Sequence, residues 1–151
     1  MPPMTLTLRG ALESDLPILA QMNKQLIDDE GSLNPMTISE LEDRMRVWLL
    51  SDWHIDLLCK DTEIVGYALY QFRDNTYYKV EREVYVRQFF ITSDHRMMGF
   101  GREGINLLKE TRFPDVKTII VDVLVNNHRG MSFWQQVGFA PYQTTMKLHT
   151  K

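Results

Sequence analysis

The residue types best suited to binding or catalysis gather in one short segment, Arg96-Met97-Met98-Gly99-Phe100-Gly101-Arg102. Gly99 and Gly101 let the main chain turn sharply and approach a ligand without interference from a Cβ atom. A helix is predicted to begin here, and a helix N-terminus offers free N–H groups and the positive end of its dipole. Phosphate oxygens fit such a place, and Arg96 and Arg102 would add positive charge. The segment therefore predicts a phosphate-binding turn, with a plain tight turn as the alternative.

Two other kinds of glycine loop do not fit this segment. A Walker loop ends in Gly-Lys-Ser or Gly-Lys-Thr, whereas Gly101-Arg102-Glu103 stands here. A dinucleotide-binding fold places its glycines after the first strand, whereas this segment lies about two-thirds along the chain. The prediction of phosphate binding therefore refers to neither loop type.

The elements before this segment are predicted from the spacing of apolar residues. Alternation over residues 5–9 indicates a strand, and the apolar stripe that follows Ser14-Asp15 indicates a helix. Thr37 and Glu40 form a capping box that opens a second helix. Three strands are then predicted, over residues 54–59, 64–72 and 84–91. Arg87-Gln88 interrupt the apolar pattern of the third strand, which predicts either a β-bulge beside a site or an ordinary half-exposed strand.

The elements after the segment continue a strand–helix–strand unit. A helix is predicted over residues 102–113, and Pro114 ends it. The run over residues 118–125 is almost continuously apolar, which is typical of a central strand buried on both faces. With the strand at 84–91, these elements form a βαβ unit that should be right-handed. The remaining predictions are a short helix over residues 130–137, a final strand over 142–149 and a single domain over 1–151.

Composition excludes several classes of protein. The 151 residues are 44% hydrophobic and 25% charged, close to the averages for a globular domain. A net charge of −3 and a pI near 5.8 argue against a nucleic-acid partner, and no apolar run is long enough to span a membrane. The lone Cys59 cannot form an internal disulfide, the four histidines are dispersed, and the start of the chain does not resemble a signal peptide. We therefore expect a cytoplasmic protein without a metal site and with neither nucleic acid nor membrane as partner.

Three motifs stand in a fixed order in the second half of the chain. Residues 96–101 follow the pattern Arg-x-x-Gly-x-Gly at the start of a predicted helix. The apolar triplet Phe89-Phe90-Ile91 precedes that pattern. Downstream follow Asn127, Gly130, Phe133-Trp134 and Gly138-Phe139. In this combination and spacing the chain resembles the GNAT superfamily of acetyl-CoA-dependent N-acetyltransferases.

The resemblance implies acetyl-CoA as the co-substrate. Main-chain groups of Phe89-Phe90-Ile91 would pair with its pantetheine arm as an added strand does. N–H groups of residues 97–102 would hold the pyrophosphate, while Asn127 and Phe133-Trp134 would border the far side of the cofactor. An amine would attack the thioester carbonyl directly, so no acyl group would become attached to the protein.

Two departures from the family pattern leave the acid–base groups open. Trp134 stands where many members have a tyrosine that protonates the leaving thiolate, and an indole N–H cannot replace a phenol as an acid. Many members also carry acids just before the triplet, where this chain has Arg87-Gln88. We predict Glu83 or Tyr85 as the catalytic base, with a merely solvated Glu83 as the alternative. Arg87 is predicted either to bind an anionic group of the acceptor or to pair with Glu83.

The expected fold belongs to the mixed α/β (α+β) class. It is a GNAT-type mixed, mostly antiparallel central sheet with a parallel, splayed central pair, flanked by about four helices. The expected activity is acetyl transfer from acetyl-CoA to the amine of a small molecule, such as an amino acid derivative. The alternatives are another acyl group, a protein amine, and a domain that binds or senses acyl-CoA without turnover. The resemblance also implies a homodimer, for which the sequence shows no interface.

Overall fold

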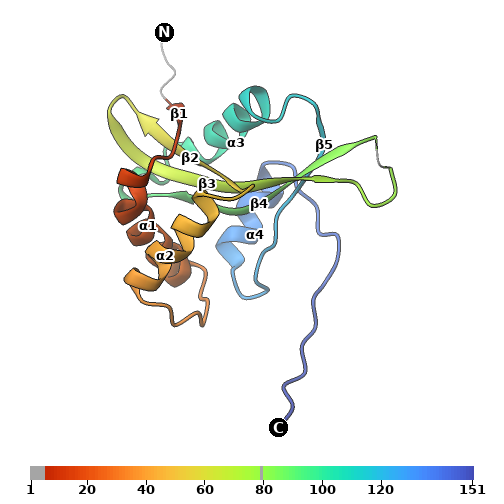
Figure 1. The fold of residues 1–151 in the computed structure, drawn as a ribbon. Helices are drawn as coiled ribbons and strands as arrows, with labels where there is room; N and C mark the ends of the chain where they lie inside the picture. Colours follow the sequence, from red (N-terminus) through yellow and green to blue (C-terminus); the bar gives the residue numbers. More distant parts are fainter. Residues whose placement is uncertain (1–5, 79) are drawn as a thin grey trace.

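A five-stranded mixed sheet organises the structure, which is a computed structural model describing residues 6–78 and 80–151. The strands, in sheet order as in sequence order, are β1 (Leu6–Gly10), β2 (His54–Lys60), β3 (Glu63–Asp74), β4 (Arg82–Ile91) and β5 (Val116–Ile120). β1 to β4 are antiparallel neighbours, and β4 and β5 run parallel (Figure 1). Thr5, the first residue of the first predicted strand, and Lys79 lie outside the described residues, as do residues 1–4.

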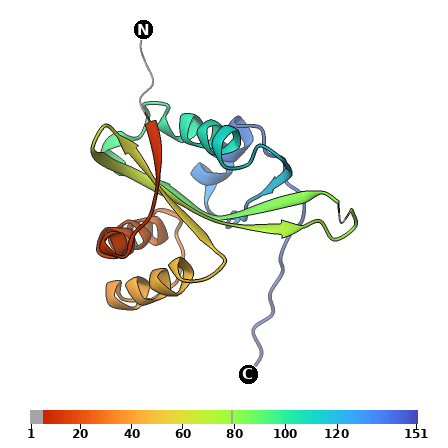
Figure 2. The ribbon, with the colours of Figure 1, turned by 45° about the horizontal axis from the view of Figure 1, so that its top comes forward.

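Helices cover both faces of this sheet. Within the described residues they are α1 (Leu16–Asp29), α2 (Ile38–Leu49), α3 (Phe100–Thr111) and α4 (His128–Gln136). α1 and α2 lie on one face, and α3 and α4 lie on the other (Figure 2). The mixed sheet, its parallel pair and the four helices confirm the predicted fold class.

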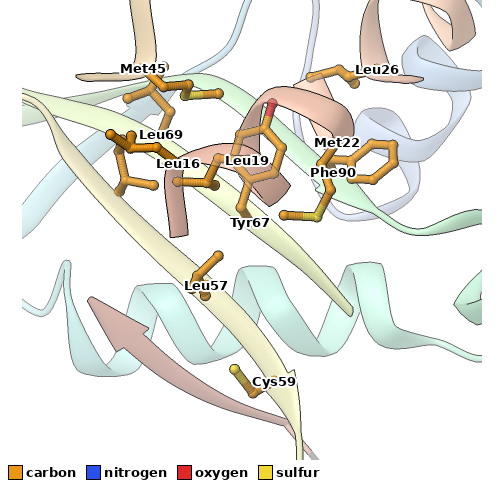
Figure 3. Packing of buried hydrophobic residues seen from close by; sticks show 11 residues of the cluster. Leu16, Leu19, Met22, Leu26, Met45, Leu57, Cys59, Tyr67, Leu69 and Phe90 are labelled. Carbon is orange, nitrogen blue, oxygen red and sulfur yellow. The ribbon is translucent and has the colours of Figure 1, made fainter. Parts of the chain in front are cut away.

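The core between α1, α2 and the sheet follows from helical spacing of apolar residues (Figure 3). Leu16, Leu19 and Leu26 of α1 are at most 8% exposed. They belong to one cluster with Tyr67 of β3, whose side chain is fully buried. Cys59 lies in the same cluster as a free, buried thiol, as the alternation around it predicted.

The predicted β-bulge in β4 is confirmed. Leu69 pairs with Gln88, but the next residue, Tyr70, pairs with Val86, so Arg87 is the extra residue. Beyond the bulge, β4 stays paired with β3 and loses β5, because the parallel pairing ends at Tyr85. The predicted splay of the parallel pair is therefore present, directly beside the bulge.

Two strand predictions are wrong. The apolar run over residues 118–125 predicted a central strand, but β5 ends at Ile120 and lies at the edge of the sheet. Residues 142–149 form no strand; they are exposed and run away from the body of the molecule (Figure 1). The two errors share one physical cause. Apolar composition and alternation indicate that a segment could form a strand, but a strand also needs a neighbour to pair with. No described segment lies beside β5 on its outer edge.

Candidate functional site

The glycine turn places a row of main-chain donors in front of α3. Met97 and Gly99 both have left-handed backbone conformations, with φ angles of 63° and 83°. Gly99 is the N-cap residue of α3, and the two methionines before it are exposed. No group of the described residues accepts a hydrogen bond from the main-chain N–H groups of residues 97–102. Consecutive free N–H groups at a helix N-terminus form a concave site for an anion.

The two glycines of this turn serve different purposes. At Gly99 a Cβ atom would meet nothing within 4 Å, so what requires glycine there is the positive φ angle. At Gly101 a Cβ atom would lie 2.7 Å from Cε1 of Phe133. Gly101 is therefore small because α4 packs against α3 at this point, whereas the sequence pattern attributed its small size to the ligand.

The two arginines of the turn point to different partners. Arg96 donates a hydrogen bond from Nε to the carbonyl of Ile91 at 2.8 Å and forms an ion pair with Asp29 at the end of α1. Arg102 is exposed and donates to the carbonyl of Gln136 at the end of α4, at 2.9 Å. The charge of Arg96 is thus already paired, whereas that of Arg102 remains beside the turn without a carboxylate within ion-pair distance among the described residues.

The apolar triplet at the end of β4 faces both ways. Phe90 packs into the core below α1, while Phe89 points to the opposite face. There the ring of Phe89 stacks on Phe133 of α4, with centroids 6.1 Å apart and planes 10° apart. Beyond Tyr85 the outer edge of β4 has no strand beside it among the described residues. The triplet therefore offers an edge with no neighbouring strand among the described residues, on which the carbonyl of Ile91 is already bound by Arg96.

The residues that α4 contributes are held by the helix itself. Asn127 is the N-cap of α4, and its side-chain oxygen accepts a hydrogen bond from the N–H of Gly130 at 3.0 Å. Trp134 lies in an aromatic cluster with Phe89, Phe133 and Phe139. Trp134 thus lies beside Phe89 of the triplet, whereas Asn127 is held by its capping contact within α4.

Neither residue predicted as the base is free of partners. Glu83 accepts a hydrogen bond from the side-chain amide of Asn75 in the β3–β4 connection. The hydroxyl of Tyr85 donates to Asp122 at 2.6 Å. Burial, and next the carboxylate of Asp122, raise the pKa of Tyr85 to about 12. Asp122 follows β5; the sequence patterns above do not single it out, although it is the one charged residue in the apolar run over residues 118–125.

Arg87 on the bulge lies beside a second arginine that the sequence patterns do not reveal. The guanidinium carbons of Arg44 and Arg87 lie 4.6 and 5.2 Å from the centroid of the Trp48 ring. Arg44 donates to the side-chain oxygen of the fully buried Asn23 at 3.1 Å. Burial, and next the positive charge of Arg87, lower the pKa of Arg44. No carboxylate of the described residues forms an ion pair with either arginine, so Arg87 does not pair with Glu83.

A cavity of about 400 Å³ lies apart from these residues, at the end of β1 and between β2, β3 and the end of α3. Its buried Asp56 accepts hydrogen bonds from Tyr70 at 2.6 Å and from two nitrogens of Arg112 at 3.1 Å. Every oxygen of that carboxylate is satisfied, and no predicted site residue lines the cavity. Among the described residues no group of three metal-ligating side chains exists, and no helix is long and apolar enough to cross a membrane.

Comparison with known proteins agrees with this geometry. The sequence model of the Acetyltransferase (GNAT) family matches residues 24–139. Among solved structures, a possible acetyltransferase from Clostridium difficile 630 is similar with a TM-score of 0.79 at 14% identity, over 98% of this chain and 99% of that one. A predicted acetyltransferase with acetyl-CoA from Clostridium acetobutylicum reaches 0.72 at 19% identity, over 95% and 96%.

An aminoglycoside acetyltransferase from an uncultured soil metagenomic sample, in complex with sisomicin, has a TM-score of 0.73 at 14% identity, over 97% of each chain. No curated protein matches this sequence. The structural likenesses concern the fold, and the family model covers most of the chain. The chain therefore belongs to the GNAT family of acetyltransferases.

Proposed function

We propose that this protein is a single-domain N-acetyltransferase that moves an acetyl group from acetyl-CoA to a small amine carrying an anionic group. The observation that carries the proposal is the opening at the end of β4. There the parallel pairing with β5 stops at Tyr85, and the row of free N–H groups at residues 97–102 lies at the end of the same strand. An unpaired strand edge next to an anion site suits a ligand that has both amide groups and a pyrophosphate.

The residues present fit acetyl-CoA. The N–H groups of residues 97–102 would bind the pyrophosphate, with Arg102 as the available charge. The main chain of Phe89-Phe90-Ile91 would bind the pantetheine amides, while Asn127 and Phe133-Trp134 would border the opening from α4. When bound, acetyl-CoA supplies a thioester that an amine can attack directly.

The acid–base groups are proposed from the contacts around the bulge. Tyr85 keeps its proton at neutral pH, because its pKa is about 12 and its hydroxyl donates to Asp122. We therefore assign Tyr85 a positioning role and propose Glu83 as the base, acting through water. Trp134 provides no acid, so the thiolate of CoA would leave with a proton taken from solvent.

The two arginines beside Trp48 support an acceptor with a carboxylate or phosphate. Both cations contact the Trp48 ring and have no carboxylate partner among the described residues, and burial, and next the charge of Arg87, lower the pKa of Arg44, so an anion bound near both would relieve their repulsion. The charge of −5 over residues 1–60 would attract the amine end of the same molecule. An amino acid derivative carries both charges.

Steady-state kinetics would test this acceptor site. We expect Arg87→Ala and Arg44→Ala each to raise KM for an anionic amine about 10- to 100-fold, the equivalent of a lost charged hydrogen bond of about 1.5–3 kcal/mol. The KM for acetyl-CoA should not change. Arg46→Ala is the matched control on α2, since Arg46 is engaged by Glu42 and Asp43. Equal losses for amines with and without an anionic group would contradict the assignment.

A second function is favoured by two observations: Trp134 cannot act as an acid, and the proton held on Tyr85 prevents its phenol from acting as a base at neutral pH. This second function is that of a domain that binds acyl-CoA without turnover. Thiol release measured with acetyl-CoA and a library of amines separates the two, because saturable CoA binding without amine-dependent release would support the binding domain. Parallel assays with longer acyl-CoA donors and with a lysine-containing protein would show whether the acyl group or acceptor differs. A cytoplasmic location and a homodimer complete the proposal.

A further inference from the structure

The ion pair between Arg96 and Asp29 joins the glycine turn to the end of α1, 67 positions away in the sequence. The two side chains are only 22% and 23% exposed, so water and salt screen their attraction weakly. Helix stability does not account for the carboxylate, because Asp29 is the last residue of α1 and a negative charge at that end opposes the helix dipole. A partner outside the helix, Arg96, compensates for this unfavourable position.

The contacts around the pair fix the place of the guanidinium. One carboxylate oxygen of Asp29 accepts a hydrogen bond from the side-chain amide of Gln25 at 2.8 Å, and the other oxygen contacts Arg96. Arg96 also donates from Nε to the carbonyl of Ile91 at 2.8 Å. Its guanidinium carbon lies 5.3 Å from the centroid of the Phe90 ring. The charge of Arg96 is thus held against the end of β4.

We propose that Asp29 is a positioning residue that holds Arg96 against β4 and thereby limits the affinity of the glycine turn for CoA. The inference rests on the proposed function, in which residues 97–102 bind the pyrophosphate. A pyrophosphate at the turn attracts the guanidinium of the adjacent Arg96 and competes for it with the carboxylate of Asp29. Transfer of Arg96 to the pyrophosphate also frees the carbonyl of Ile91 for the pantetheine arm.

This competition favours the departure of the product. CoA keeps its pyrophosphate after it has lost the acetyl group, so a contact that only strengthened binding at the turn would also slow product release. When CoA departs, the carboxylate of Asp29 takes back the guanidinium of Arg96. The guanidinium therefore has an anionic partner before and after release, and CoA leaves without exposing an unpaired, largely buried charge.

Isothermal titration with CoA tests the effect of Asp29. Asp29→Asn removes the charge and keeps the shape of the side chain, so Kd for CoA should fall about 3- to 10-fold at low ionic strength, and this gain should shrink as salt is added. Pantetheine, which has no pyrophosphate to draw Arg96 away, should gain less than about twofold. Asp28→Asn is the matched control, because Asp28 is exposed and its side chain has no hydrogen bond or ion pair within the part of the chain that the structure describes. Its Kd for CoA should equal that of the parent chain.

Nitrogen NMR of the arginine side chains is a second measurement, and it needs no change at Asp29. The Nε–H signal of Arg96, assigned by its loss in Arg96→Gln, should move when CoA is added, because Nε leaves the carbonyl of Ile91. The signal should stay in place when pantetheine is added.

The outcomes separate this inference from the proposed function. A parent chain that binds no CoA would overturn both. A parent chain that binds CoA would leave the proposed function standing, and three results would then overturn the inference alone. They are an unchanged or weaker affinity for CoA in a folded Asp29→Asn chain, an equal gain with Asp28→Asn or with pantetheine, and an Arg96 signal that does not move at saturating CoA.

Discussion

Replacement of Gly101 by alanine is expected to disturb the contact between α3 and α4. The added Cβ would lie 2.7 Å from Cε1 and 3.0 Å from Cζ of Phe133, whereas ordinary contacts begin near 3.4 Å. The ring would have to move by about 0.7 Å. It is not free to do so, because it stacks on Phe89 and meets Trp134 edge-on at 5.0 Å.

Overpacking of this kind costs about 1–3 kcal/mol, from which the better helix propensity of alanine recovers up to about 1 kcal/mol. We therefore expect Gly101→Ala to lower the stability of the protein by about 1–2 kcal/mol and Tm by about 2–8 °C. Thermal and urea unfolding of the variant would measure both values. CoA affinity should fall as well, because α4 borders the opening.

A double-mutant cycle provides the decisive control. Phe133→Leu removes the ring atoms that the new methyl group would meet, so Gly101→Ala should cost less in that background, by at least about 0.5 kcal/mol. Gly99→Ala is the matched comparison, because it is strained by a φ angle of 83° and has open space around its Cβ position. Its cost should be the same in the parent chain and in the Phe133→Leu background. Additive effects of Gly101→Ala and Phe133→Leu would refute the steric account.

Three further predictions concern polar contacts. The pKa of Tyr85 is about 12 in the folded protein and about 10 in the unfolded chain, so the free energy of unfolding should fall as pH rises through this window. Tyr85→Phe should make this fall smaller, as measured by urea unfolding at pH values of about 9 and 11. Asn127→Ala should cost about 1 kcal/mol by removing the cap of α4, while Asn127→Asp should keep most of it. Asp56→Asn should lower the free energy of unfolding by about 2–4 kcal/mol, because it leaves the partly exposed guanidinium of Arg112 without its charge partner. A denaturation midpoint equal to that of the parent protein would contradict this expectation.

Much of the fold could be predicted because local signals agree with the tertiary structure. Thr37 and Glu40 form the predicted capping box of α2, with a hydrogen bond of 3.2 Å from the N–H of Glu40 to the threonine hydroxyl. The break in the apolar pattern at Arg87 marks the bulge, since an extra residue shifts the alternation by one. Both features depend on residues close in sequence.

The candidate site could be predicted only in part, for a related reason. The glycine turn is local and therefore predictable, but Arg44 of α2 and Arg87 of β4 both contact Trp48, and no spacing rule links positions so far apart. The contact between Gly101 and Phe133 is likewise tertiary. The edge position of β5 depends on which strand lies beside it, and a single sequence does not specify that.

The order of the sheet has a consequence for how the molecule folds. β2, β3 and β4 are joined by short connections, so their antiparallel contacts close small loops and carry a low entropic cost. β5 joins last, through a crossover that contains α3, and shares only a few pairs with β4. Local unfolding should therefore begin at β5, and its amides should exchange with deuterium well before those of β2 and β3. The wall of the cofactor opening is thus the least cooperative part of the sheet, and a ligand bound there would slow the exchange of the β5 amides first.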